Sequence, residues 1–196
     1  WSPDGHQVAI GTKSDQIKIV DIRSMQPIFD QKFTIEINEF GWGKTMQQFI
    51  LTTGHGTVQV YDTVSYNLQQ TLNAHTSNCY CLDFDSTGRF FATGGADAVI
   101  LVWDCKSFIP VQSFTSLASA PRTLAFSYDG NCVAAGSEDR VLEIWRMETG
   151  QSLVQIPVNS PVNTLAWHPF KQLVAFAEDL SSDRSSGLKI FGFENC

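Results

Sequence analysis

The sequence predicts an all-β fold made of a repeated unit, because two markers recur in phase and the segments between them alternate. An aromatic residue followed by a polar turn recurs every 41 or 42 residues, at Trp1, Trp42, Phe84, Phe126 and Trp167. Short strands end 19 residues after the first four of these, at Val20, Tyr61, Trp103 and Trp145. Apolar and polar residues alternate within the segments, and Gly, Asp and Asn separate them, as antiparallel strands require.

Each unit holds four short strands. A further strand follows each aromatic marker, as in HQVAIGT, RFFATGG and NCVAAGS, and a closing strand follows in segments 67–73, 110–116 and 152–158. Four strands in about 40 residues are typical of a β-propeller blade. We therefore expect residues 1–196 to form a single propeller domain with five blades, at roughly 1–33, 34–73, 74–116, 117–158 and 159–196. The two terminal blades are expected to be incomplete, as in an open arc of a seven-bladed ring, which needs roughly 290 residues at this period.

The third unit carries a family resemblance. Segment 73–104, which ends in the pair Trp103 and Asp104, resembles a complete WD repeat. This resemblance implies a hydrogen-bonded chain inside the blade, made of His75, Thr93, Asp97 and Trp103. A catalytic pair of His75 and Asp97 is the alternative, but the repeat register favours a structural tether. The other blades are degenerate, since Ala135 replaces the hydroxyl residue in the fourth and His55 replaces the turn aspartate in the second.

Motifs for catalysis or metal binding are weak. Segment 38–45 (NEFGWGKT) ends like a phosphate-binding loop, but Asn38 stands where that motif needs Gly, and Trp42 is a repeat marker on a strand. Cys79 and Cys81 share a strand face near His75, yet no further ligands follow at usable spacing, so we expect core thiols. We expect no catalytic residue, no metal, no cofactor and no small-molecule substrate, and hence no enzyme.

The charge balance limits the partners. The chain has 13 Lys and Arg residues against 20 Asp and Glu residues, a net charge of −7, and the cations are scattered. Strong direct binding to nucleic acid needs clustered cations and is therefore not expected. The longest apolar run, segment 98–103, is too short to span a bilayer, so no membrane contact is expected.

Four equivalent positions are candidates for partner binding. They precede each of the last four aromatic markers by four residues, and they are Asn38, Tyr80, Arg122 and Asn163. These side chains include the aromatic and guanidinium groups that anchor protein interfaces. Our hypothesis is that they contact a partner at the narrow end of the propeller. The alternative, that they satisfy local backbone groups, is equally open.

The last unit contains an insertion. Phe191 follows Trp167 by 24 residues rather than 19, and the five extra residues fall in the Ser- and Asp-rich turn 178–187. A partner contact or a phosphorylation site is one interpretation. A tolerated surface insertion is the other, because lengthening a surface loop costs little free energy.

Several segments are more particular than the general repeat. NAHTSNC (73–79), FATGGADA (91–98) and AWHP (166–169), together with the long turn, resemble the WD-repeat branch found in the THO complex. That resemblance implies a non-catalytic nuclear scaffold whose partners are other THO/TREX subunits, with a role in mRNA processing and export and with RNA handled by other components. A ubiquitin-ligase substrate receptor or a chromatin-associated adaptor would use the same scaffold. A propeller hydrolase would need His and carboxylate residues clustered at the central channel, which this sequence does not display.

Overall fold

The computed structural model describes residues 1–178 and 187–192 of the chain. Most of the inserted turn at 178–187 therefore lies outside the described residues. The described part contains strands and turns but no helix, and accordingly no helix in it is long and apolar enough to cross a membrane. The all-β prediction is confirmed.

The described residues form eighteen strands, which make five antiparallel sheets in chain order. The first sheet contains β1 (Gln7–Gly11), β2 (Gln16–Asp21) and β3 (Gln26–Lys32). The second contains β4 (Ile37–Trp42), β5 (Gln48–Thr53), β6 (Thr57–Asp62) and β7 (Leu68–Asn73). The third contains β8 (Cys79–Phe84), β9 (Phe90–Gly95), β10 (Ile100–Asp104) and β11 (Pro110–Phe114). The fourth contains β12 (Pro121–Phe126), β13 (Cys132–Ser137), β14 (Val141–Arg146) and β15 (Ser152–Pro157), and the fifth contains β16 (Val162–Trp167), β17 (Leu173–Glu178) and β18 (Leu188–Gly192).

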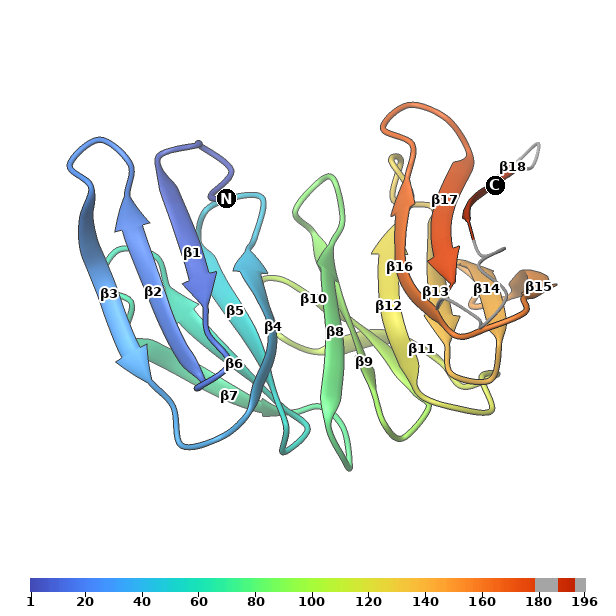
Figure 1. Cartoon of the computed structure of the whole chain (residues 1–196), viewed down its shortest axis with the longest axis horizontal. Helices are drawn as coiled ribbons and strands as arrows, with labels where there is room; N and C mark the ends of the chain where they lie inside the picture. The colour runs from blue at the N-terminus through green and yellow to red at the C-terminus, as the bar shows by residue number, and fades with distance from the viewer. Residues whose placement is uncertain (179–186, 193–196) are drawn as a thin grey trace.

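The sheets are blades arranged side by side in an arc (Figure 1). The inner strands β4, β8, β12 and β16 are neighbours along the concave side, where β8 contacts β4 and β12, and β12 contacts β16. In Figure 1 the turns that follow these inner strands lie along the upper edge, and the loops that join successive blades lie along the lower edge. Three-stranded sheets at both ends and four-stranded sheets between them agree with the expectation of two incomplete blades.

The hydrophobic cores lie between blades rather than within them. One cluster joins Ala92 and Val102 of the third blade to Leu124, Val133 and Trp145 of the fourth. Similar clusters fill the other three gaps between neighbouring sheets. Burial of each large apolar side chain contributes about 2–3 kcal/mol. Packing of sheet on sheet therefore provides most of the driving force for this fold.

A turn motif repeats where the third strand of a blade meets the fourth. Asp104 accepts hydrogen bonds from the backbone N–H groups of Lys106 (3.0 Å) and Ser107 (2.7 Å), and Phe108 then adopts a positive φ of 55°. Asp21 and Asp62 make the same kind of turn. Hydrogen bonds from the following Ser hold the pKa of each of these three aspartates below its usual value. These turns give the first three blades the same outer corner.

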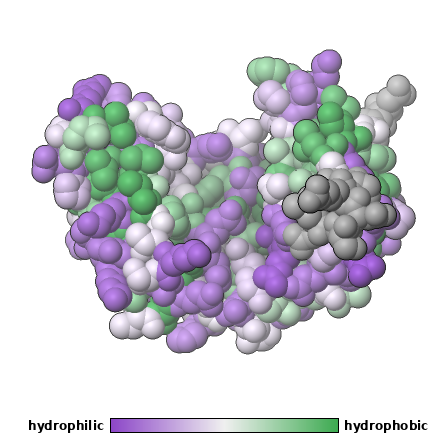
Figure 2. Space-filling view, in the orientation of Figure 1, coloured by the Kyte–Doolittle hydropathy of each residue, from purple (hydrophilic) through white to green (hydrophobic). Residues whose placement is uncertain are grey.

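The terminal blades each have one uncovered face. Ile10 and Ile28 in the first blade and Leu188 and Ile190 in the last are exposed, although they lie on strands whose counterparts in the middle blades face a neighbouring sheet. Figure 2 shows green, apolar surface over the first blade at one end of the arc, and a hollow between its two arms.

Candidate functional site

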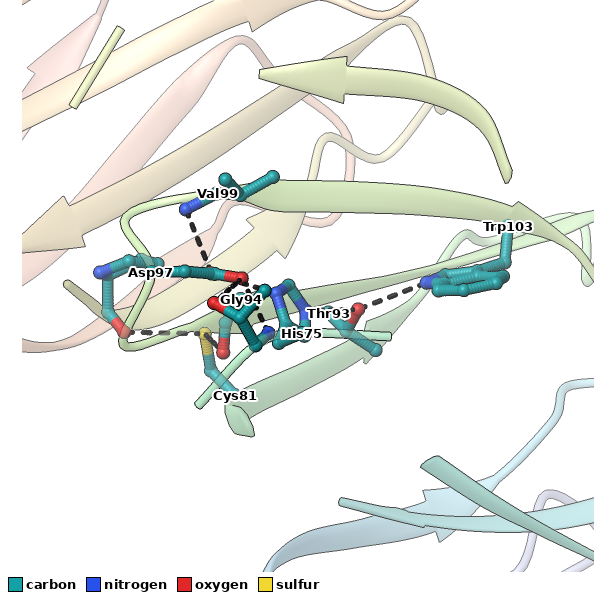
Figure 3. A network of polar contacts seen from close by, with 9 residues as sticks. His75, Cys81, Thr93, Gly94, Asp97, Val99 and Trp103 are labelled. Atoms are coloured by element: carbon teal, nitrogen blue, oxygen red, sulfur yellow. Dashed lines mark hydrogen bonds and ion pairs between the residues drawn. The ribbon is translucent and has the colours of Figure 1, made fainter. Parts of the chain in front are cut away.

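Four polar side chains of the third blade form one continuous chain (Figure 3). His75 Nδ1 lies 3.0 Å from Asp97 Oδ1, and His75 Nε2 lies 3.0 Å from Thr93 Oγ1. Trp103 Nε1 donates to the same Thr93 oxygen at 3.0 Å. The chain runs from the loop before β8 to Trp103 on β10. The structure thus brings together all four residues that the WD-repeat resemblance implies.

A neutral imidazole completes the chain without leaving a donor unpaired. Trp103 donates to Thr93, the Thr93 hydroxyl donates to His75 Nε2, and His75 Nδ1–H donates to Asp97. Burial lowers the pKa of His75, and the neighbouring Asp97 carboxylate only partly offsets this effect. The His75 side chain and Thr93 are sealed from solvent. This geometry ties strands together and presents no nucleophile or base to a substrate.

The fourth blade contains a different chain that the sequence reasoning missed. Trp145 Nε1 donates to Ser116 Oγ at 2.9 Å, and the Ser116 hydroxyl donates to Glu143 Oε1 at 2.9 Å. Glu143 is fully buried, and its other oxygen has no hydrogen-bond partner among the described residues. A glutamate at an inward position of β14 was the available signal, because a buried acid needs a partner nearby.

The four candidate partner-binding residues share one backbone feature. Each is the second residue of its inner strand, and the strand pairing shifts register around each of them. The affected residues are Asn38 in β4, Tyr80 in β8, Arg122 in β12 and Asn163 in β16. Such β-bulges redirect side chains away from the regular alternation of a strand. The blades thus present these residues at the edge of the concave side.

Their contacts differ from blade to blade. Asn38 Nδ2 donates to the carbonyl oxygen of Cys79 at 2.9 Å, which is a contact with a backbone group of the next blade. Arg122 stacks over the Tyr80 ring, with its Cζ atom 4.4 Å from the ring centroid, and it also pairs with Glu138. Asn163 is exposed at the same strand position. The structure therefore brings together Tyr80 and Arg122, from two neighbouring blades.

Two carboxylates that the sequence analysis did not single out connect the inner strands. Glu39 Oε2 accepts a hydrogen bond from the Leu82 backbone N–H at 2.6 Å, and Asp83 Oδ2 accepts one from the Phe126 N–H at 2.9 Å. Each bond joins one blade to the next. Burial raises the pKa of Asp83 to about 6, although the Phe126 N–H acts in the opposite direction. These side chains are structural links between neighbouring inner strands on the concave side of the arc.

Three cysteines of the third blade are part of the core. Cys79, Cys81 and Cys105 are buried and free. Burial raises the pKa of all three thiols, that of Cys105 to about 12, so none is a thiolate at neutral pH. Cys81 Sγ lies 3.8 Å from the carbonyl oxygens of Gly94 and Pro121, the second from the next blade (Figure 3). Across residues 1–178 and 187–192, no group of three or more His, Cys, Asp and Glu side chains is arranged to hold a metal ion.

Comparison with known proteins agrees with this architecture. The family model described as "WD domain, G-beta repeat" matches residues 66–104 and 109–146. THO complex subunit 3 of Arabidopsis thaliana is 38% identical over 199 residues, covering 100% of this chain and 63% of the relative. WD repeat-containing protein AAC3 of Dictyostelium discoideum is 29% identical, covering 100% of this chain and 42% of that protein.

Solved structures share the fold. A chain in the crystal structure of the mitotic checkpoint complex superimposes with a TM-score of 0.87 at 23% sequence identity, covering 99% of this chain and 60% of that chain. The chain thus spans less than two thirds of the length of the curated relatives and of this structure. The family match shows that residues 66–104 and 109–146 are WD repeats, and the five sheets together with the superposition show that the chain has the β-propeller fold.

Proposed function

We propose that this chain is the propeller of a non-catalytic scaffold subunit of the THO complex. In this role it supports mRNA processing and export from the nucleus, within the TREX assembly, through contacts with other protein subunits. The observation that carries the proposal is the 38% identity to THO complex subunit 3, which extends over the whole of this chain. The propeller provides the rigid frame that such a scaffold needs.

The geometry supports a docking face at the bulged ends of the inner strands. Tyr80 and Arg122 form a stacked pair there, and side chains of these two types dominate the energetics of protein interfaces. The Arg122 guanidinium is held from below by the ring and at one edge by Glu138, so it loses little conformational entropy on binding. Asn163, in the same strand position of the next blade, extends this face.

The charge distribution supports a division of labour with RNA-binding subunits. The chain carries a net charge of −7, and Arg122 is already paired with a carboxylate. A surface of this kind repels a phosphate backbone. The proposed partners are therefore proteins.

The test is affinity purification of the tagged full-length protein from nuclear extract, with and without RNase, followed by mass spectrometry. We expect the large THO subunits to co-purify in an RNase-resistant manner. Arg122→Glu should reduce their recovery, because it removes the stacked cation and places two carboxylates together. Lys18→Glu is the matched control, since it reverses the charge in another exposed ion pair, with Asp30 in the first blade. Its recovery should equal that of the wild type.

Recovery of other partner proteins would favour a different function. Recovery of cullin adaptors would favour a ubiquitin-ligase receptor, and recovery of histones would favour a chromatin adaptor. Either result without THO subunits contradicts the proposal while leaving the propeller fold intact.

A further inference from the structure

A groove of about 680 Å³ lies between the third and fourth blades. Its walls come from the turns that follow β8 and β12, from β11 and from the residues that follow β14. Tyr80 and Arg122 lie at the beginning of β8 and β12, so the groove opens at the opposite edge of the arc from the proposed docking face. Figure 1 places these turns along its upper edge.

The groove has an apolar floor. Phe90 and Met147 are partly buried and pack against the core that the third and fourth blades share. Val111 in β11 adds an aliphatic side chain that is 49% exposed. Gln112 Nε2 donates to the Met147 carbonyl oxygen at 3.4 Å, which connects the two walls across the gap. The floor is therefore preformed, and apolar surface of this kind gains free energy when a partner covers it.

The rim of the groove is acidic. Asp104, Asp129 and Glu148 line it, and none of them belongs to an ion pair formed within the described ranges 1–178 and 187–192. Arg89 is the cation of the lining, and it stacks on Phe90 with its Cζ atom 4.9 Å from the ring centroid.

Two of these carboxylates are held in the charged form by their turns. A backbone hydrogen bond from Ser107 holds the pKa of Asp104 below its usual value. Burial opposes the charge on Asp129, but hydrogen bonds from Ser127 and Asn131 outweigh it and keep its pKa low. The rim thus carries fixed negative charge beside apolar surface at neutral pH.

We propose that this groove binds an extended segment of a partner protein that combines aliphatic and basic side chains. The aliphatic group covers Phe90, Val111 and Met147, and Lys or Arg side chains reach the three rim carboxylates. Charge complementarity selects this partner over an acidic segment, which the rim repels. This is a second protein-binding site, and it does not depend on the proposed docking face at Tyr80 and Arg122.

The first measurement is fluorescence anisotropy of the full-length protein with a short labelled peptide of alternating lysine and leucine. A peptide of alternating glutamate and leucine tests the charge preference. We expect saturable binding of the lysine peptide only, weakened by added salt because the rim charges are at the surface. Glu148→Lys should weaken this binding about tenfold, since one favourable charge contact becomes a repulsive one. The Glu148 side chain is exposed, so the variant should fold.

Two further variants separate the groove from general surface charge. Val111→Ser should weaken the lysine peptide several-fold by removing apolar floor. Asp30→Lys makes the same change of charge in the distant first blade, and Arg122→Glu alters the proposed docking face. Both should leave the affinity unchanged. Equal weakening by Glu148→Lys and Asp30→Lys, or an affinity that neither groove variant alters, would overturn the proposal.

Discussion

The third and fourth blades have the same four-stranded architecture, but they provide different hydrogen-bond partners for the indole N–H of their buried tryptophans. In the third blade, Trp103 ends a polar chain that runs through Thr93 and His75 to Asp97. In the fourth, Ala135 lies 42 residues after Thr93, and Leu117 lies 42 residues after His75. Trp145 bonds instead to Ser116, which in turn bonds to Glu143.

Both tryptophans nevertheless stack on a phenylalanine, and each lies in a core that its blade shares with the preceding blade. Trp103 stacks on Phe91 with a centroid distance of 5.9 Å, and Trp145 stacks on Phe114 with a centroid distance of 5.0 Å. Apolar packing between sheets therefore maintains the blade, and the polar chain has only to provide a partner for each buried donor. The third blade meets this condition fully, whereas the fourth leaves one Glu143 oxygen unpaired among the described residues.

The largest effect is expected from breaking the complete chain. Thr93→Val keeps the side-chain volume but removes the oxygen that Trp103 and His75 share. The free energy of unfolding should fall by about 3 kcal/mol, because two buried groups lose a partner. Denaturant titration of the full-length protein measures this change. Thr93→Ser retains the hydroxyl and should recover most of the stability, and a small loss in the Val variant would show that the chain contributes little.

The opposite sign is expected in the fourth blade. Glu143→Leu removes a buried carboxylate, and Ser116 still accepts the hydrogen bond of Trp145. The free energy of unfolding should rise by about 2 kcal/mol, because an acid with an unpaired oxygen is replaced by apolar packing. Glu143→Gln keeps an acceptor for Ser116 but leaves an amide unpaired, so it should bring no gain. Destabilisation by Glu143→Leu would contradict the comparison.

A smaller, pH-dependent effect is expected at the link between the two blades. Asp83 has a folded-state pKa of about 6, raised from 3.8. The folded protein therefore holds this proton more readily than the unfolded chain, and wild-type stability falls as the pH rises from about 4 to about 6. Asp83→Asn keeps an acceptor for the Phe126 N–H without the charge.

Relative to the wild type, Asp83→Asn should thus gain about 2 kcal/mol of stability between pH 4 and pH 8, because each unit of the raised pKa corresponds to about 1.4 kcal/mol and part of the change lies below pH 4. Thermal unfolding at both pH values provides the measurement. A difference that is the same at both values would exclude the titration of Asp83 as its cause.

The β-propeller architecture could be predicted from the sequence because the chain contains a regular repeat. Aromatic markers such as Phe84 and Phe126 predict inner strands because every blade reuses the same packing position. The chain at His75, Thr93, Asp97 and Trp103 followed from its resemblance to a complete WD repeat. The chain from Trp145 through Ser116 to Glu143 could not be predicted in this way. It requires a loop residue and a strand residue that meet only in the folded structure, and sequence spacing does not show such a contact.

The β-bulges at the start of the inner strands could not be predicted from the sequence either. Position within the repeat selected Tyr80 and Arg122, but their stacking requires a register shift in each of two neighbouring strands. The links from Glu39 and Asp83 to the next blade cross sheet boundaries in the same way. The sequence pattern thus predicts the strands and marker residues of a single blade, whereas the contacts between blades can be identified only from the structure.

The smallest change in stability is expected at the docking face, where the two blades meet at the surface. Arg122→Ala removes the stacking on Tyr80 and the pair with Glu138, and both partners in that pair are about 40% exposed. Exposed pairs of this kind contribute less than about 1 kcal/mol, so the unfolding midpoint should barely move. Recovery of protein partners should fall markedly, because an anchored guanidinium in an interface is worth more than the same group in water. A large loss of stability with unchanged partner recovery would assign Arg122 to holding the blades together, as the bonds at Thr93 do within a blade.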